Sequence, residues 1–272
     1  MVNSYRPASL QQALEILANN KVTPYAGGTD LMINPEEDPV YLFLDRIPEL
    51  NNIFEDAEYI HIGAGCTFTD ILEHKLSPAI LKEASVLLAA PAIRNFATAG
   101  GNICNGSPKG DSTLVFYAAD AKLRLVSSKG ERVIPIADFF LGRNKTALQA
   151  DELLVEILMN KACLDHYYYQ KVGARNALAI ARVSFAAILS MEGGRITICR
   201  TAFGAVSNVI ISRADIDAML TGQTIEAAKA IKEDYLAAYD QAIKPIKGRI
   251  SAEYRKAVCM NLLRDFLQNN GI

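Results

Sequence analysis

Two short segments built around adjacent glycines constrain this chain more than any other feature. One is residues 25–31, Tyr-Ala-Gly-Gly-Thr-Asp-Leu, and the other is residues 98–112, Thr-Ala-Gly-Gly-Asn-Ile-Cys-Asn-Gly-Ser-Pro-Lys-Gly-Asp-Ser. Glycine adds backbone freedom and proline removes a donor, so we expect the second segment to form neither a core helix nor a core strand. A single Gly-Gly pair favours a plain surface loop. Two similar loops instead indicate one anionic ligand that is bound from two sides.

The first glycine loop lies between a predicted strand and a predicted helical turn. Ser9 is the predicted N-cap of an amphipathic helix, which is followed by a strand over 22–26 and a turn over 31–33. Thr29 or Asp30 can cap that turn. Unpaired N–H groups at such a junction point toward a bound anion. The alternative is a tight turn that requires a positive φ.

The pattern of apolar residues changes near residue 160. Before it, we predict strands over 40–44, 59–62 and 153–158, helices over 80–90 and 113–119, and a hairpin of 122–126 with 131–135. After it, we predict an antiparallel hairpin of 182–191 with 195–203, which has one buried face, and helices over 224–239 and 251–268. This order predicts a second, smaller α+β domain.

The charge balance argues against a nucleic-acid or anionic-membrane partner. Lys plus Arg number 28 and Asp plus Glu 30, which gives a formal charge of −2. The run of tyrosines at 167–169, followed by Lys171 and Arg175, therefore favours a strand edge near an anionic ligand over a nucleic-acid platform. We find no signal peptide and no apolar run of membrane-spanning length, so we expect a cytoplasmic protein.

Neither the cysteines nor the histidines have the spacing of a metal site. The five cysteines are scattered and the three histidines are single. We interpret His61 and His74 as isolated side chains without a carboxylate or cysteine partner. We therefore expect no metal site in this chain, and any redox chemistry must come from an organic cofactor.

No catalytic constellation stands out, so we predict no catalytic residue. Asp30 and Asp111 each follow a glycine loop. They could form an acid–base pair, but hydrogen bonds to sugar hydroxyls or backbone N–H groups are favoured. Arg94 is interpreted as a solvated or phosphate-facing charge. The chain has neither Gly-x-Gly-x-x-Gly nor a P-loop. A nucleotide must then be held in some other way.

The two loops, in this order and followed by Ser-Pro-Lys-Gly-Asp at 107–111, closely resemble the FAD-binding (medium) subunit of the molybdenum hydroxylases. That family includes xanthine, carbon monoxide and nicotinate dehydrogenases. The resemblance implies a vanillyl-alcohol-oxidase-type α+β fold: an FAD-binding domain over 1–160, with subdomains of roughly 1–55 and 56–160, and a C-terminal α+β domain over 161–272.

The resemblance also implies which residues bind FAD. The first loop would wrap the diphosphate through backbone N–H groups; its residues are Pro24, Tyr25, Ala26, Gly27, Gly28, Thr29 and Asp30. The diphosphate would also be bound from the second subdomain, by Thr98, Gly101 and Asn102. Asp111 would contact sugar hydroxyls or the nearby chain. Leu88 and Leu154 would pack against the ring systems, or be simple core residues. Lys171 would lie near the pyrimidine edge of the flavin, or be a surface charge.

The implied function is electron transfer within a larger complex. FAD would pass electrons from the iron–sulfur clusters of one partner subunit to an acceptor, with NAD the expected one. A second partner would carry the molybdenum cofactor and act on a purine or other N-heterocycle. Two alternatives stay open: a free-standing flavin-dependent reductase of the same fold, and a flavin-free nucleotide-binding or assembly protein.

Overall fold

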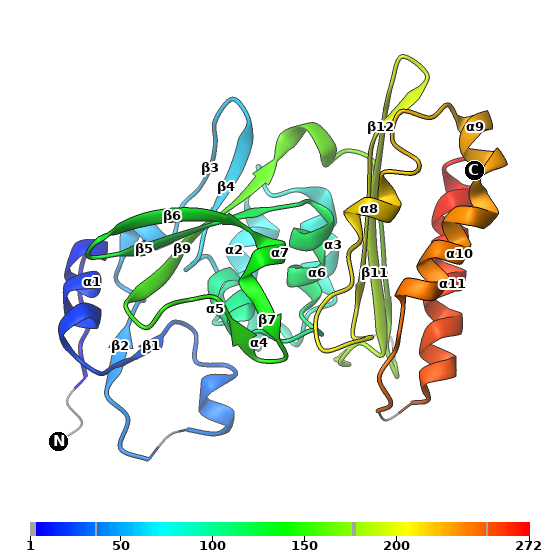
Figure 1. Cartoon of the computed structure of the whole chain (residues 1–272). Helices are drawn as coiled ribbons and strands as arrows, with labels where there is room; N and C mark the ends of the chain where they lie inside the picture. Colours follow the sequence, from blue (N-terminus) through cyan, green and yellow to red (C-terminus); the bar gives the residue numbers. More distant parts are fainter. Residues whose placement is uncertain (1–3, 36, 176–177, 249) are drawn as a thin grey trace. The chain divides into compact units, whose positions relative to one another are not determined.

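The computed structural model describes residues 4–35, 37–175, 178–248 and 250–272 (Figure 1). The chain forms two compact units, each assembled from separate segments of the sequence. Unit 1 contains Met1–Ser77, Leu88–Ser107 and Ala121–Asn160, and unit 2 contains Pro78–Leu87, Pro108–Asp120 and Lys161–Ile272. Residues 161–272, predicted as a domain, therefore share unit 2 with two segments from the first 160 residues.

Unit 1 begins with helix α1 (Leu10–Asn19), which packs beside a parallel pair of strands, β1 (Thr23–Tyr25) and β2 (Tyr41–Phe43). The Ser9 hydroxyl accepts a hydrogen bond from the Gln12 N–H at 3.3 Å, which confirms the predicted N-cap. Two 3₁₀ turns lie on either side of β2 in the sequence: η1 (Leu31–Ile33) and η2 (Pro48–Leu50).

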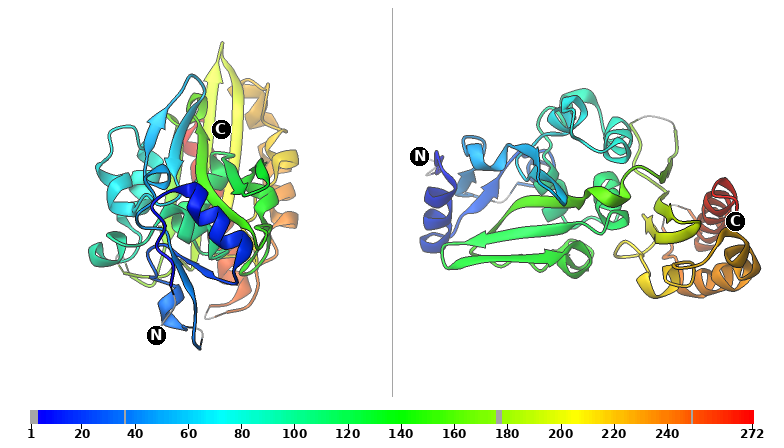
Figure 2. Two further views of the ribbon diagram at one scale, coloured as in Figure 1. Left: turned by 90° about the vertical axis from the view of Figure 1, so that its left-hand side faces the viewer. Right: turned by 90° about the horizontal axis from the view of Figure 1, so that it is seen from above.

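A five-stranded antiparallel sheet forms the larger part of unit 1. Its strands, in spatial order, are β3 (Ile53–Glu55), β4 (Tyr59–Gly63), β9 (Glu152–Asn160), β5 (Lys122–Ser127) and β6 (Gly130–Pro135). Strands β9, β5 and β6 run side by side (Figure 2), and β5 with β6 is the predicted hairpin. The other elements of unit 1 are α2 (Phe68–Glu73), α4 (Pro91–Arg94), α5 (Ala99–Cys104), α7 (Ile136–Phe139), β7 (Phe140–Gly142) and β8 (Lys145–Thr146).

Unit 2 is built on a three-stranded antiparallel sheet of β10 (Tyr167–Val172), β11 (Val183–Glu192) and β12 (Arg195–Gly204), with β11 in the centre. Helices α3 (Ala79–Val86) and α6 (Asp111–Ala118) cover one face (Figure 1). The other face carries the C-terminal helices α10 (Lys232–Ala242) and α11 (Ala252–Asn269). The remaining elements are η3 (Lys161–Cys163), α8 (Ala214–Asp217) and α9 (Ile225–Ala230).

The central strand β11 corrects the prediction of one buried face. Its first seven residues, Val183 to Leu189, are all buried. The second face is covered by α3 and α6, which come from the first half of the chain. Alternation along a strand shows which face is more apolar, but it does not show a cover supplied by distant segments.

Two predicted helices end differently in the structure. The helix predicted over 80–90 ends at Val86, because the chain turns at Ala89 with φ +46°. The helix predicted over 224–239 is divided into α9 and α10 by Ile231, whose φ of −105° and ψ of 9° are not helical. Ser251 caps α11 as expected. Within the described ranges, no helix is both long and apolar enough to cross a bilayer.

The prediction that residues 98–112 contain no core helix is wrong. Helix α5 occupies part of this segment and packs against β4 and β9. Its first turn is capped by Thr98, and Gly100 is fully packed: a Cβ there would lie 2.6 Å from the Cβ of Ala64. Glycine is required here for close approach of the helix to the sheet, and this packing outweighs the low helix propensity of the residue.

Candidate FAD-binding site

The loop between β1 and η1 carries four consecutive amides that donate no hydrogen bond within the described residues. They belong to Gly27, Gly28, Thr29 and Asp30, and Gly28 has φ +69°. Successive backbone amides next to a left-handed residue form a concave donor surface that binds anions. The loop therefore supplies donors of the kind that a diphosphate requires.

The structure brings the two glycine loops together within unit 1. A Cβ at Gly27 would lie 1.8 Å from the carbonyl oxygen of Phe96, so only glycine permits this approach. The Asn105 Nδ2 donates a hydrogen bond to the Asp30 Oδ2 at 3.0 Å. Phe96 lies just before the second loop and Asn105 lies within it, and neither was singled out from the sequence. The Asp30 carboxylate thus accepts from a side-chain amide, which is neither the backbone N–H nor the sugar hydroxyl that was favoured from the sequence.

In the second loop, both candidate amides are already bonded within the chain. The Thr98 hydroxyl accepts from the Gly101 N–H at 3.0 Å, and the Thr98 carbonyl accepts from the Asn102 N–H at 3.0 Å. These are the capping and first-turn bonds of α5. The second loop therefore supports the first one rather than presenting a second row of free amides.

Leu88 and Leu154 are both buried in unit 1, with exposed fractions of 8% and 6%. Leu88 lies in the bend between α3 and α4, and Leu154 lies in β9 opposite Leu125. Arg94 is half-buried, which corrects its interpretation as a solvated charge, while the phosphate-facing alternative stays a prediction. Its Nη1 donates to the carbonyl oxygens of Leu88 and Ala89, each at 2.9 Å.

Asp111 and Lys171 form a buried ion pair within unit 2. The Lys171 Nζ lies 2.6 Å from the Asp111 Oδ2 and donates to the Leu87 carbonyl at 2.8 Å. The two side chains are 9% and 8% exposed, so Lys171 is not a surface charge. Burial raises the pKa of the Asp111 carboxyl, while the Lys171 ammonium opposes that rise. The Asp111 Oδ1 is buried without a partner among the described residues.

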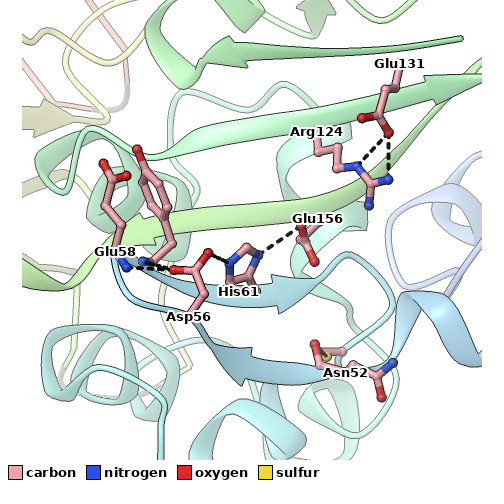
Figure 3. Close-up of polar contacts among 9 residues, drawn as sticks. Asn52, Asp56, Glu58, His61, Arg124, Glu131 and Glu156 are labelled. Atoms are coloured by element: carbon pink, nitrogen blue, oxygen red, sulfur yellow. Dashed lines mark hydrogen bonds and ion pairs between the residues drawn. The ribbon is translucent and has the colours of Figure 1, made fainter.

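His61 is not isolated, contrary to the sequence interpretation. Its Nε2 lies 3.0 Å from the Asp56 Oδ2, and its Nδ1 lies 3.1 Å from the Glu156 Oε2 (Figure 3). The pairing of β4 with β9 brings Glu156 there, which no local pattern indicates. Asp56 also accepts from the N–H of Tyr59 at 2.6 Å, and these bonds lower its pKa to about 2. Across the described ranges, no cluster of three His, Cys, Asp or Glu side chains is arranged to hold a metal ion.

The α+β fold carries an amide-lined loop suited to an anionic ligand. Residues 1–159 match the family described as "FAD binding domain in molybdopterin dehydrogenase", and residues 167–270 match "CO dehydrogenase flavoprotein C-terminal domain". The xanthine dehydrogenase FAD-binding subunit of Escherichia coli O157:H7 is 33% identical, with 92% of this chain and 89% of that protein covered. The nicotinate dehydrogenase FAD-subunit of Eubacterium barkeri is 31% identical, with 93% and 90% covered.

A solved structure agrees with these matches. Reconstituted CO dehydrogenase from Oligotropha carboxidovorans superposes with a TM-score of 0.87 at 26% identity, covering 97% of this chain and 96% of that chain. The chain therefore belongs to the FAD-binding subunits of the molybdenum hydroxylases. It is an oxidoreductase flavoprotein subunit whose cofactor is FAD, and the predicted fold class is confirmed.

Proposed function

We propose that this subunit passes electrons from the iron–sulfur clusters of a partner subunit, through FAD, to NAD⁺. The observation that carries the cofactor-binding part is the row of free amides from Gly27 to Asp30. Four donors in a concave loop match the oxygen atoms of a diphosphate. When bound, FAD exchanges single electrons and hydride, so it couples one-electron donors to a two-electron acceptor.

We assign the diphosphate chiefly to the first loop. Its amides bind phosphate oxygens, and Asn105 holds the Asp30 carboxylate so that it can accept hydrogen bonds from sugar hydroxyls. The second loop, whose Gly101 and Asn102 amides are occupied, fixes the first loop through the Phe96 backbone. The domain boundary at 160 and the flavin contacts of Leu88, Leu154, Asp111 and Lys171 stay predictions.

The partner and substrate assignments rest on the relatives. These are named as FAD subunits or medium chains of xanthine, nicotinate and carbon monoxide dehydrogenases. We infer that iron–sulfur clusters and a molybdenum cofactor lie in other subunits. A purine or other N-heterocycle is the proposed substrate, since xanthine and nicotinate are both N-heterocycles.

Purification of the native complex tests the proposal. We expect FAD, iron and molybdenum in the complex, release of FAD on denaturation, and formation of NADH with xanthine or nicotinate. An isolated full chain that oxidises NADPH with an organic substrate would instead indicate a free-standing reductase. A full chain that takes up no FAD would indicate an assembly protein. Either result would refute the proposed function.

A further inference from the structure

The bend between α3 and α4 places an alanine in a backbone conformation that favours glycine. Ala89 has φ +46°, and the chain continues through Ala90 into the short helix α4. A Cβ in the left-handed region lies too close to the following carbonyl oxygen, so neighbouring contacts must hold such a residue there. Leu88, directly before it, is buried.

Arg94 supplies those contacts. Its Nη1 donates to the carbonyl oxygens of Leu88 and Ala89, each at 2.9 Å, and the next carbonyl, Ala90, accepts from the N–H groups of Ile93 and Arg94. Side chains of a helix point toward its N-terminus, so an arginine in the last turn of α4 reaches back to the bend. Pro91 occupies the first position of α4, where its fixed φ favours the start of a helix. Three successive carbonyls of the bend are thus bound by α4.

We propose that Arg94 is a positioning residue: it holds the left-handed bend at Ala89 and so fixes the side chain of Leu88 for contact with FAD. This inference rests on the proposed function, in which Leu88 packs against the FAD rings. In this proposal Arg94 acts on the backbone that carries Leu88, since its Nη1 donates to the carbonyls of the bend.

The test separates the charge of Arg94 from its effect on the bend. Four full-chain variants are compared: Arg94→Ala, Ala89→Gly, the double variant, and Arg46→Ala, a control that removes an exposed arginine of the same unit. Glycine adopts a positive φ without the penalty of alanine, so Ala89→Gly weakens the need for Arg94. We expect Arg94→Ala to bind FAD about ten-fold more weakly, and the double variant to regain about three-fold of that loss. Arg46→Ala should leave the affinity unchanged.

A second measurement does not depend on FAD. Hydrogen exchange of the Ile93 amide, which is bonded to the Ala90 carbonyl, reports the bend in FAD-free protein. We expect the Ile93 amide to exchange about ten-fold faster in Arg94→Ala. The free-energy cost of one alanine in the left-handed region corresponds to about that factor. Unchanged exchange would overturn the inference. Equal FAD affinities of Arg94→Ala and the double variant, both less salt-sensitive than wild type, would indicate a lost phosphate contact and would also overturn it. Wild-type protein that binds no FAD would refute the proposed function, while exchange would still decide on Arg94.

Discussion

Replacing Gly27 by alanine should strongly weaken FAD binding. The added Cβ would lie 1.8 Å from the carbonyl oxygen and 2.5 Å from the carbonyl carbon of Phe96, and 3.1 Å from the nitrogen of Ala97. All three atoms belong to the backbone, so no side-chain rotation relieves the overlap. The first loop must move by roughly 1.6 Å to reach ordinary contact.

Such a shift misplaces the amides of Gly27 and Gly28. A hydrogen bond to a charged group contributes about 1.5–3 kcal/mol, so the loss of two contributes at least about 3 kcal/mol. This corresponds to an increase of roughly 100-fold in the dissociation constant for FAD. Overpacking should also lower the free energy of unfolding by about 1–3 kcal/mol.

Isothermal titration of the full chain with FAD measures the effect. The control is Gly193→Ala in the β11–β12 turn, where φ is +57° and an added Cβ meets no atom within 4 Å. That variant should lose about 1–2 kcal/mol of stability from backbone strain and keep its FAD affinity. If Gly27→Ala binds FAD within two-fold of wild type, the first loop is not the diphosphate site.

Three further predictions concern buried or paired charges. Lys171→Met leaves Asp111 buried without its cation, so urea titration should show a loss of about 3–5 kcal/mol in unfolding free energy; wild-type stability would contradict this. Burial raises the pKa of the Asp217 carboxyl to about 6, so the free energy of unfolding should fall as the pH rises from 3.8 to about 6. The urea midpoint measured across this pH range should show the fall, and Asp217→Asn should remove it. The pKa of Asp56 is lowered to about 2, so its contribution is present above 3.8 and lost as the pH falls toward 2; an unchanged acid limb in Asp56→Asn would refute this.

The features predicted correctly from the sequence are local ones. Ser9 and Ser251 cap their helices through hydrogen bonds to amides three residues ahead, and the β5–β6 hairpin is closed by its own turn. The first glycine loop is equally local, since its free amides follow from a strand that ends before a left-handed glycine. The spacing of residue types along the chain was sufficient to predict these caps, this hairpin and this loop.

The errors arise where distant segments meet. Helix α5 forms because Gly100 fits against Ala64, and His61 gains a carboxylate because β4 pairs with β9. Neither partner is visible in the local sequence. The interpretation of Arg94 as a solvated charge failed for a different reason: its Nη1 bonds the carbonyls of a bend whose positive φ at Ala89 the residue type does not indicate.

The discontinuous composition of unit 2 has a consequence for how the chain is made. The chain passes between the units five times, and α6, all of whose residues are buried in the finished fold, is synthesised long before the strands that it covers. Until β11 and β12 emerge, this apolar helix has no partner sheet. We expect unit 2 to form only after the last third of the chain is complete, with a nascent chain that needs protection from aggregation until then. A fragment containing only 161–272 would lack α3 and α6, leave one face of its sheet uncovered, and aggregate.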